Sequence, residues 1–192
     1  VVGGGPGGME AAITAAQRGH SVTLYEKKDR LGGQIIHEQH IPIKKDMYHF
    51  IEVIARRCEK AGVEIHLNQE VTPEEVAAME ADVVMTAIGA SPIVPPIPGT
   101  EKEKVVGLNV LEKEQPEIGQ KVVVLGGGLV GTEVGIYLDM IGKDVTIIEM
   151  KETWAADSYW MHKVAMDKYI RDSKMKIMVK TKVTEITEEG VV

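Results

Sequence analysis

Two short glycine-rich segments have the residue types and the spacing that bind the phosphates of a dinucleotide. The first spans residues 1–8 and reads VVGGGPGG, and the second spans residues 124–131 and reads VLGGGLVG. Both contain the pattern G-x-G-x-x-G, in which the first glycine allows a tight turn, the second lets the backbone approach a pyrophosphate, and the third lets helix and strand pack closely. Unpaired N–H groups at the start of the following helix would face the phosphates.

An acidic residue follows each segment at the same distance. Glu26 lies 23 residues after Gly3, and Glu149 lies 23 residues after Gly126. An acid about 20 residues after the first glycine accepts hydrogen bonds from the adenosine ribose of a dinucleotide. Glycines that serve only as turn residues would explain one copy, but not two copies with identical acid spacing. The sequence therefore predicts two dinucleotide sites.

The surrounding elements repeat in the same order. Each glycine segment leads into an apolar helical stretch and then into a short strand that ends at the acid. Helical spacing predicts further helices over 44–61 and 158–173, followed by strands over 63–67 and 175–179. Thr72 and Glu75 form a helix-start pattern, with Thr72 as the expected N-cap.

The segment between the two halves predicts a domain boundary. Residues 81–90 read as a buried strand that runs into a turn, and a stretch rich in proline and charge follows them. We expect an incomplete dinucleotide-binding lobe over 1–96, a crossover linker over 97–103 and a second dinucleotide-binding lobe over 104–192; the family resemblance described below implies FAD for the first lobe and NAD(P) for the second. The predicted fold class is α/β, with two Rossmann-like three-layer β/α lobes, mainly parallel sheets and incomplete ends.

Composition and charge argue against several classes of function. Hydrophobic residues make up 44% of the chain and aromatic residues only 4%, which suits buried parallel strands rich in Val, Ile and Leu. The net charge of −7 argues against a nucleic-acid partner, and no apolar run approaches the roughly 20 residues of a membrane helix. Because Cys58 is the single cysteine, the chain forms no internal disulfide, and we expect a cytoplasmic location.

Several motifs together resemble one family. They are VVGGGPGGMEAA at the start, LGGQ at 31–34, TAIGASP at 86–92, PPIPG at 95–99 and VVVLGGGLVGTE in the second half. The chain thereby resembles the FAD/NAD(P)-binding module of the pyridine nucleotide-disulfide oxidoreductases. It is most similar to the C-terminal part of old-yellow-enzyme-like NADH:flavin oxidoreductases, namely relatives of 2,4-dienoyl-CoA reductase, enoate reductase and trimethylamine dehydrogenase.

The resemblance implies which residues bind each cofactor. The FAD site would include Gly3, Gly5, Pro6, Gly8, Glu26, Lys27, Gly32, Gly33, Gln34, Ala87 and Gly89. The nicotinamide site would include Gly126, Gly128, Val130, Gly131, Glu133 and Glu149. Glu133 matches an acid that lies near the nicotinamide in relatives, and the alternative is an acid placed in the first turn of a helix by the helix dipole.

Two departures from the family pattern matter. No redox cysteine pair is present, and Cys58 is expected to be a small core residue on a helix. The chain also stops at Val192, before the segment that returns to complete the FAD lobe in relatives, and it opens abruptly at Val1. We therefore expect an incomplete FAD site and an isolated chain that is inactive and purified without stoichiometric FAD.

The implied function is a fragment of a flavin-dependent NAD(P)H oxidoreductase. Hydride would pass from NADH to FAD, with NADP less favoured, and electrons would continue to a fused or partner acceptor domain. In the resembling family that acceptor is an iron–sulfur cluster and then FMN. The alternatives are a non-catalytic nucleotide-binding scaffold, or a stand-alone NADH oxidase or ferredoxin reductase. We expect no acid–base catalytic residue, and we interpret residues 37–40 (HEQH) as a solvated loop rather than a metal site.

Overall fold

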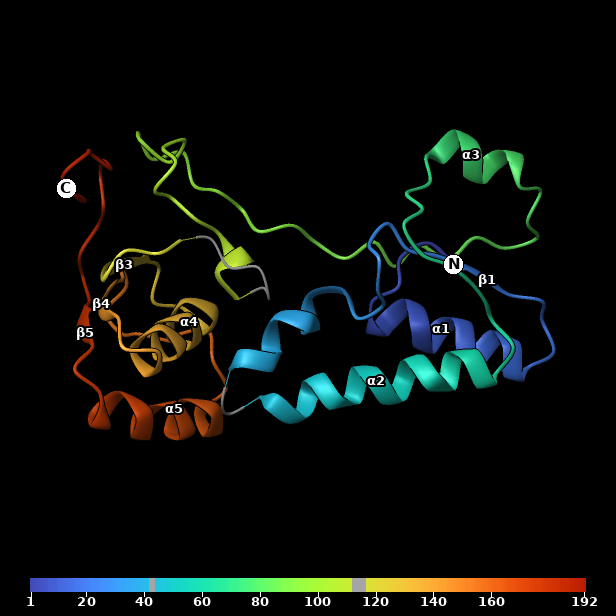
Figure 1. The fold of residues 1–192 in the computed structure, drawn as a ribbon, viewed down its shortest axis with the longest axis horizontal. Coiled ribbons are helices and arrows are strands. Elements are labelled where there is room, and N and C mark those ends of the chain that lie inside the picture. Colours follow the sequence, from blue (N-terminus) through green and yellow to red (C-terminus); the bar gives the residue numbers. More distant parts are fainter. Residues whose placement is uncertain (42–43, 112–116) are drawn as a thin grey trace. The chain divides into compact units, whose positions relative to one another are not determined.

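The computed structural model describes residues 1–41, 44–111 and 117–192. The chain divides into two compact units (Figure 1). Unit 1 consists of Val1–Gln39 and Lys44–Ser91, and unit 2 consists of Pro92–Val192 together with His40 and Ile41. The predicted boundaries at residues 96 and 104 remain predictions. No helix in the described part of the chain is long and apolar enough to cross a membrane.

Unit 1 is a small α/β arrangement in which a parallel strand pair lies beside the residues that lead into the glycine turn. Its elements are α1 (Pro6–Gln17), β1 (Thr23–Tyr25), the 3-10 helix η1 (Gly33–His40), α2 (Lys45–Lys60), β2 (Glu64–His66) and α3 (Pro73–Ala78). Strand β1 pairs in parallel with β2, and Val2 forms parallel bridges to Tyr25 on one side and Thr86 on the other. The turn after Val2 therefore lies at the carboxyl end of a parallel sheet, where ligands bind in open α/β folds.

The core of unit 1 lies between α1, α2 and β1. Met9 and Ile13 of α1 are fully buried against Leu24 of β1, and Ile54 and Cys58 of α2 complete the cluster. The prediction that Cys58 is a small core residue is thus confirmed. Apolar residues at these helical spacings bury one face of each helix.

The predicted helix start at Thr72 is also confirmed. Thr72 Oγ1 accepts a hydrogen bond from the Glu75 amide at 3.2 Å, and the Glu75 carboxylate accepts one from the Thr72 amide at 2.8 Å. These two bonds form a capping box, which satisfies two amides that a helix start otherwise leaves unpaired. The box accounts for α3 beginning at Pro73.

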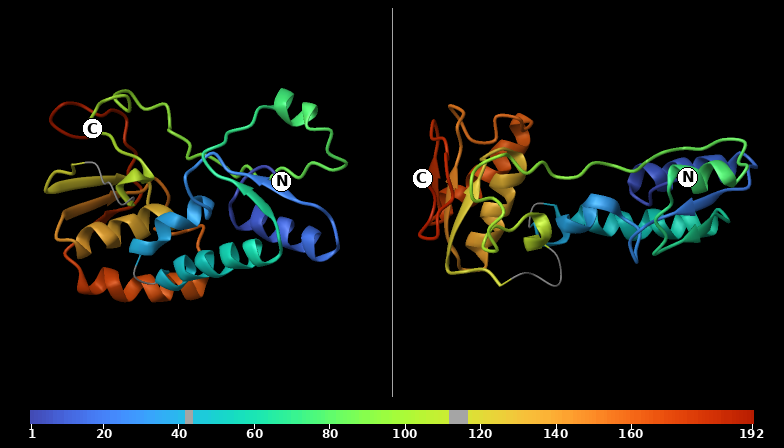
Figure 2. Two further views of the ribbon diagram at one scale, coloured as in Figure 1. Left: turned by 45° about the vertical axis from the view of Figure 1, so that its right-hand side comes forward. Right: turned by 90° about the horizontal axis from the view of Figure 1, so that it is seen from above.

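Unit 2 contains a three-stranded parallel sheet. Its elements are η2 (Leu108–Leu111), β3 (Lys121–Leu125), α4 (Leu129–Met140), β4 (Asp144–Ile148), α5 (Trp160–Asp172) and β5 (Lys176–Met178). The strands are ordered β3-β4-β5, and Figure 2 shows them beside α4 and α5. The predicted α/β class with two Rossmann-like parallel arrangements is confirmed by this topology.

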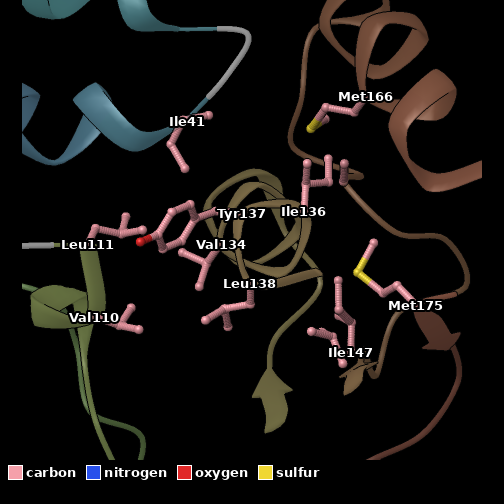
Figure 3. Close-up of a cluster of buried hydrophobic side chains, with 12 residues drawn as sticks. Ile41, Val110, Leu111, Val134, Ile136, Tyr137, Leu138, Ile147, Met166 and Met175 are labelled. Atoms are coloured by element: carbon pink, nitrogen blue, oxygen red, sulfur yellow. The ribbon is translucent and has the colours of Figure 1, made fainter. Parts of the chain in front are cut away.

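Helix α4 forms the centre of the unit 2 core. Every residue from 132 to 138 is buried, as expected for a helix that is covered on most sides. In Figure 3, Tyr137 and Val134 point toward Leu111 and Val110, whereas Ile136 points toward the side that carries Met166. This packing fixes the axis of α4 and with it the direction in which its first amides point.

The predicted linker residues contact the end of the chain. The Ile186 amide donates to the Pro98 carbonyl at 2.8 Å, and Lys102 forms an ion pair with Glu188. Ile186 and Val183 are buried in a small cluster that Ile97 and Val105 cover in part. Residues 97–105 are therefore held against one face of unit 2.

Two sequence expectations are wrong in detail. Residues 81–90 form a single bridge through Thr86 rather than a buried strand, and Val83 and Ile88 are 72% and 75% exposed. Only one side of this segment is paired, and a hollow of about 920 Å³ separates it from α1. Residues 37–40 belong to the 3-10 helix η1 rather than to a solvated loop, and only 8% of His37 is exposed.

Candidate dinucleotide sites

The first glycine turn has the geometry that a pyrophosphate site requires. Gly3 has a φ of +104°, a conformation that residues with side chains rarely adopt, and its amide donates to the Tyr25 carbonyl at 2.8 Å. Gly5 is the N-cap of α1 and Pro6 is its first residue, so the free amides of this helix start lie just after the turn. A Cβ atom added at Gly7 would meet no atom within 4 Å, which leaves room for a ligand.

The second turn repeats this geometry. Gly126 has a φ of +97°, its amide donates to the Ile148 carbonyl at 2.9 Å, and Gly128 is the N-cap of α4. Each of these residues lies 123 positions further along the chain than its counterpart in unit 1. The register agrees as well, since Leu125 pairs with Ile148 just as Val2 pairs with Tyr25.

Each predicted ribose acid is buried behind its own glycine turn. Glu26 Oε2 accepts from the Gly4 amide at 2.7 Å, and its Oε1 accepts from the Lys28 amide at 2.8 Å. Both acids are only 7% exposed, and each uses one oxygen for the turn and one for the loop beyond the strand. A carboxylate oxygen has a second lone pair, so these bonds leave acceptor capacity for a ribose hydroxyl.

In unit 2 the same two bonds recur. Glu149 Oε2 accepts from the Gly127 amide at 2.8 Å, and its Oε1 accepts from the Lys151 amide at 2.7 Å. The acid thus ties the glycine turn to the loop after β4. Charge-assisted bonds of this kind are stronger than bonds between neutral groups, so both turns are held in place without a ligand.

The loop after each acid folds back onto its glycine turn. The Gly32 amide donates to the Gly4 carbonyl at 2.9 Å, and the Ala155 amide donates to the Gly127 carbonyl at 2.6 Å. The predicted loop LGGQ at 31–34 is therefore structurally equivalent to WAAD at 154–157. No letter is shared between the two loops, so sequence comparison did not reveal this part of the repeat.

The structure brings most predicted FAD-site residues together in unit 1. A Cβ atom at Gly3 would lie 2.4 Å from the Ala87 carbonyl oxygen, and one at Gly33 would lie 3.0 Å from the Gly5 Cα. Gln34 donates its side-chain amide to the Ala90 carbonyl at 3.2 Å. Thus two separate segments, 31–34 and 87–90, both contact residues at or beside the turn.

Some predicted residues lie at the edge of these sites. Lys27 pairs with Glu70 at 3.7 Å on the exposed surface, and Gly89 is exposed with a φ of +69°. Val130, the second residue of α4, is 52% exposed. The cofactor roles assigned to individual residues remain predictions.

Glu133 occupies the second turn of α4, so the explanation as a first-turn dipole acid is wrong. Its side chain is 4% exposed and lies 3.2 Å from Nε2 of His162 on α5. The equivalent residue of unit 1, Glu10, is exposed and pairs with Arg57 of α2 at 3.3 Å. In both units this glutamate therefore contacts a basic side chain on the second helix.

Asp157 is a site residue that no sequence motif indicates. Its carboxylate accepts a hydrogen bond from the Leu129 amide at 2.9 Å, at the start of α4. A Cβ atom at Gly128 would lie 3.1 Å from the same carboxylate. The only sequence clue is its position eight residues beyond the ribose acid, which gains meaning once the two loops are seen to be equivalent.

Two dinucleotide-type turns on parallel sheets define a protein of the two-Rossmann-unit class. Residues 1–192 match the family described as pyridine nucleotide-disulphide oxidoreductase. The chain is 40% identical to an NADH oxidase of Thermoanaerobacter brockii and 36% identical to a cinnamate reductase of Clostridium sporogenes. Both matches cover the whole of this chain, but only 30% of the NADH oxidase and 29% of the cinnamate reductase. A solved structure of 2-naphthoyl-CoA reductase in complex with 2-naphthoyl-CoA is 32% identical to this chain and has a TM-score of 0.94. The match covers the whole of this chain and 29% of the reductase chain.

The chain belongs to the pyridine nucleotide-disulphide oxidoreductase family, as the sequence resemblance predicted. The cofactors of this family are FAD and NAD(P), which confirms the predicted pair. The chain spans about 30% of the length of the relatives described above. Their reactions and substrates therefore belong to proteins that contain much more than the two units seen here.

Proposed function

We propose that these 192 residues are the cofactor-binding part of a flavin-dependent NADH oxidoreductase. Unit 1 would hold FAD and unit 2 the nicotinamide dinucleotide, and electrons would leave the FAD for an acceptor outside this chain. One observation supports this proposal above all. Both units present the same glycine turn, buried acid and open helix start, repeated at an interval of 123 residues.

The residues fit a dinucleotide in both units. In unit 1 the first amides of α1 follow the turn, and Glu26, which bonds to the Gly4 amide of that turn, would accept from the ribose. The same groups exist in unit 2, where Glu149 takes the place of Glu26. When bound, the two cofactors supply the hydride-transfer chemistry, and the protein supplies binding and orientation.

Assignment of FAD to unit 1 rests on the LGGQ loop and the 87–90 segment. Gly33 lies close to the Gly5 backbone, and the neutral Gln34 side chain donates to the Ala90 carbonyl. A turn without a competing charge beside it suits a cofactor that stays bound. Unit 2 replaces this loop with WAAD, which places a carboxylate beside the α4 start. This difference suits a dinucleotide that binds and leaves.

Electron exit by a dithiol is not available to the described chain, because Cys58 is buried in the unit 1 core and is its only cysteine. We therefore propose a fused or partner acceptor domain. An acceptor with an iron–sulfur cluster and FMN agrees with the family resemblance. We also propose a cytoplasmic location, where a single free cysteine is typical.

Reduction of bound flavin by NADH in the complete protein tests this function. We expect one FAD per chain and anaerobic loss of its visible absorption after NADH is added. The flavin should recover its colour when an electron acceptor is supplied. Tight NADH binding without any loss of flavin absorption would instead favour a non-catalytic nucleotide-binding scaffold.

A further inference from the structure

The two equivalent loops differ in what they place at the start of the glycine-turn helix. The shared backbone bonds, Gly32 to Gly4 and Ala155 to Gly127, put Gln34 and Asp157 at the same position of the repeat. Gln34 is neutral and turns its amide toward the Ala90 carbonyl. Asp157 is charged and turns its carboxylate toward the α4 start.

Asp157 accepts a hydrogen bond from a backbone amide that would otherwise bind a pyrophosphate. Its Oδ1 accepts from the Leu129 amide at 2.9 Å, and its Oδ2 lies 3.1 Å from the place where a Gly128 Cβ would be. Leu129 is the first residue of α4, so its amide is one of the free donors at the positive end of the helix dipole. A pyrophosphate at this turn would compete with Asp157 for that amide and would be repelled by its charge.

The Asp157 side chain is free to leave the helix start. The residue is exposed to solvent, and no other side-chain hydrogen bond of its carboxylate occurs within the described part of the chain. Its backbone loop is nevertheless held by the buried Ala155, whose amide bonds to Gly127. The carboxylate can therefore rotate into water while the loop stays in place.

We propose that Asp157 is an affinity-determining residue of the second site, an internal anion that the incoming dinucleotide must displace from the start of α4. This rests on the proposed assignment of the nicotinamide dinucleotide to unit 2. Asp157 weakens binding of NADH and NAD⁺ alike, so that the dinucleotide exchanges at each turnover. The FAD turn carries Gln34 at the same position and keeps its cofactor.

The test measures dissociation constants of the complete, flavin-loaded protein for NADH, ADP-ribose and adenosine. Asp157→Asn keeps the shape and can still accept from the Leu129 amide, but it removes the charge. We expect this variant to bind NADH and ADP-ribose about twofold to fivefold more tightly, the range that a charge at a helix start gives. Binding of adenosine, which has no phosphate, should not change, and the FAD content should stay the same.

Asp172→Asn is the matched control. Asp172 is an exposed carboxylate at the last residue of α5, roughly 18 Å along the helix from Trp160. The Asp172→Asn variant loses the same charge as Asp157→Asn, and its affinity for NADH should equal that of the wild type. Asp157→Ala removes both the charge and the cap and should also bind ADP-ribose more tightly.

Two results would overturn the proposal in distinguishable ways. If Asp157→Asn bound NADH and ADP-ribose with unchanged or lower affinity while adenosine binding stayed the same, Asp157 would be a structural cap or a direct ligand contact. If neither the wild type nor the variants bound any of the three probes in unit 2, the assignment of the nicotinamide dinucleotide to that unit would fail as well.

Discussion

A Cβ atom on Gly8 would lie 1.9 Å from the carbonyl oxygen of Gly3. No side chain can approach a backbone carbonyl so closely, so the third glycine of the motif is required by packing alone. Gly131 has the same relationship to Gly126, again at 1.9 Å. These glycines hold each helix against its strand whether or not a cofactor is present.

Gly8→Ala should therefore destabilise the fold even without cofactor. We expect the free energy of unfolding to fall by about 1–3 kcal/mol, as for other overpacked positions, in chemical denaturation of the cofactor-free chain. Gly7→Ala is the control, because its added Cβ would meet nothing within 4 Å. It should leave stability unchanged or raise it by up to about 1 kcal/mol. Equal losses in both variants would contradict the packing argument.

Valine at the second glycine should separate the two cofactor functions. Gly5 has an ordinary φ of −72°, and its nearest neighbour would be 3.8 Å from an added Cβ, so Gly5→Val should fold but exclude the FAD pyrophosphate. Gly128→Val should keep FAD and lose reduction by NADH. Flavin content and NADH-dependent bleaching of the complete protein measure both effects. Equal loss of flavin from two folded variants would show that the units are assigned wrongly.

The second site should prefer NADH over NADPH. The Glu149 carboxylate is held in place by two backbone amides, and a 2′-phosphate on the adenosine ribose would approach this buried negative charge. No arginine occurs between Glu149 and Arg171 to neutralise it. We expect at least about tenfold tighter binding of NADH, or about 1.4 kcal/mol, in titrations of the complete protein. Equal or tighter binding of NADPH would show that Lys151 offsets the repulsion.

Cys58 should react slowly with thiol reagents in the folded chain. Burial raises the pKa of its thiol, and the charges of Glu59 and Glu10 raise it further, so less reactive thiolate is present at neutral pH. Raising the pH through that elevated pKa should increase the rate of alkylation by iodoacetamide. Denaturant should abolish the protection. Rapid alkylation of the native chain at neutral pH would contradict a core position for this cysteine.

The sequence predicted the repeated elements well, because their patterns are local. Helix α2 and the capping box at Thr72 follow from side-chain periodicity and from a three-residue spacing. The apolar run over 81–90 predicts a buried strand, whereas burial depends on a neighbour that the run itself does not encode. The neighbour of this segment is Val2, which forms the bridge to Thr86 through hydrogen bonds with Met85 and Ala87.

The loop after the acid keeps its backbone turn in unit 2 without keeping its glycine. Ala155 has a φ of +44° where its equivalent Gly32 has +128°, so the backbone turn is retained although the glycine is not. A motif search that relies on glycine cannot find this loop. Asp157 carries no sequence signal for the same reason, since its position is defined by the Ala155 hydrogen bond to Gly127.

Glu26 and Glu149 have a consequence for the entropy of cofactor binding. Each carboxylate bonds to the glycine turn and to the loop beyond the strand, and the Glu26 backbone also receives the Gln69 amide at 2.9 Å. The turn is therefore already in one conformation when a dinucleotide arrives. Because little chain freedom is lost on binding, most of the free energy of the phosphate contacts remains as affinity. Removal of either acid would loosen the turn as well as deleting a ribose contact, so its effect on affinity should exceed that of one lost hydrogen bond.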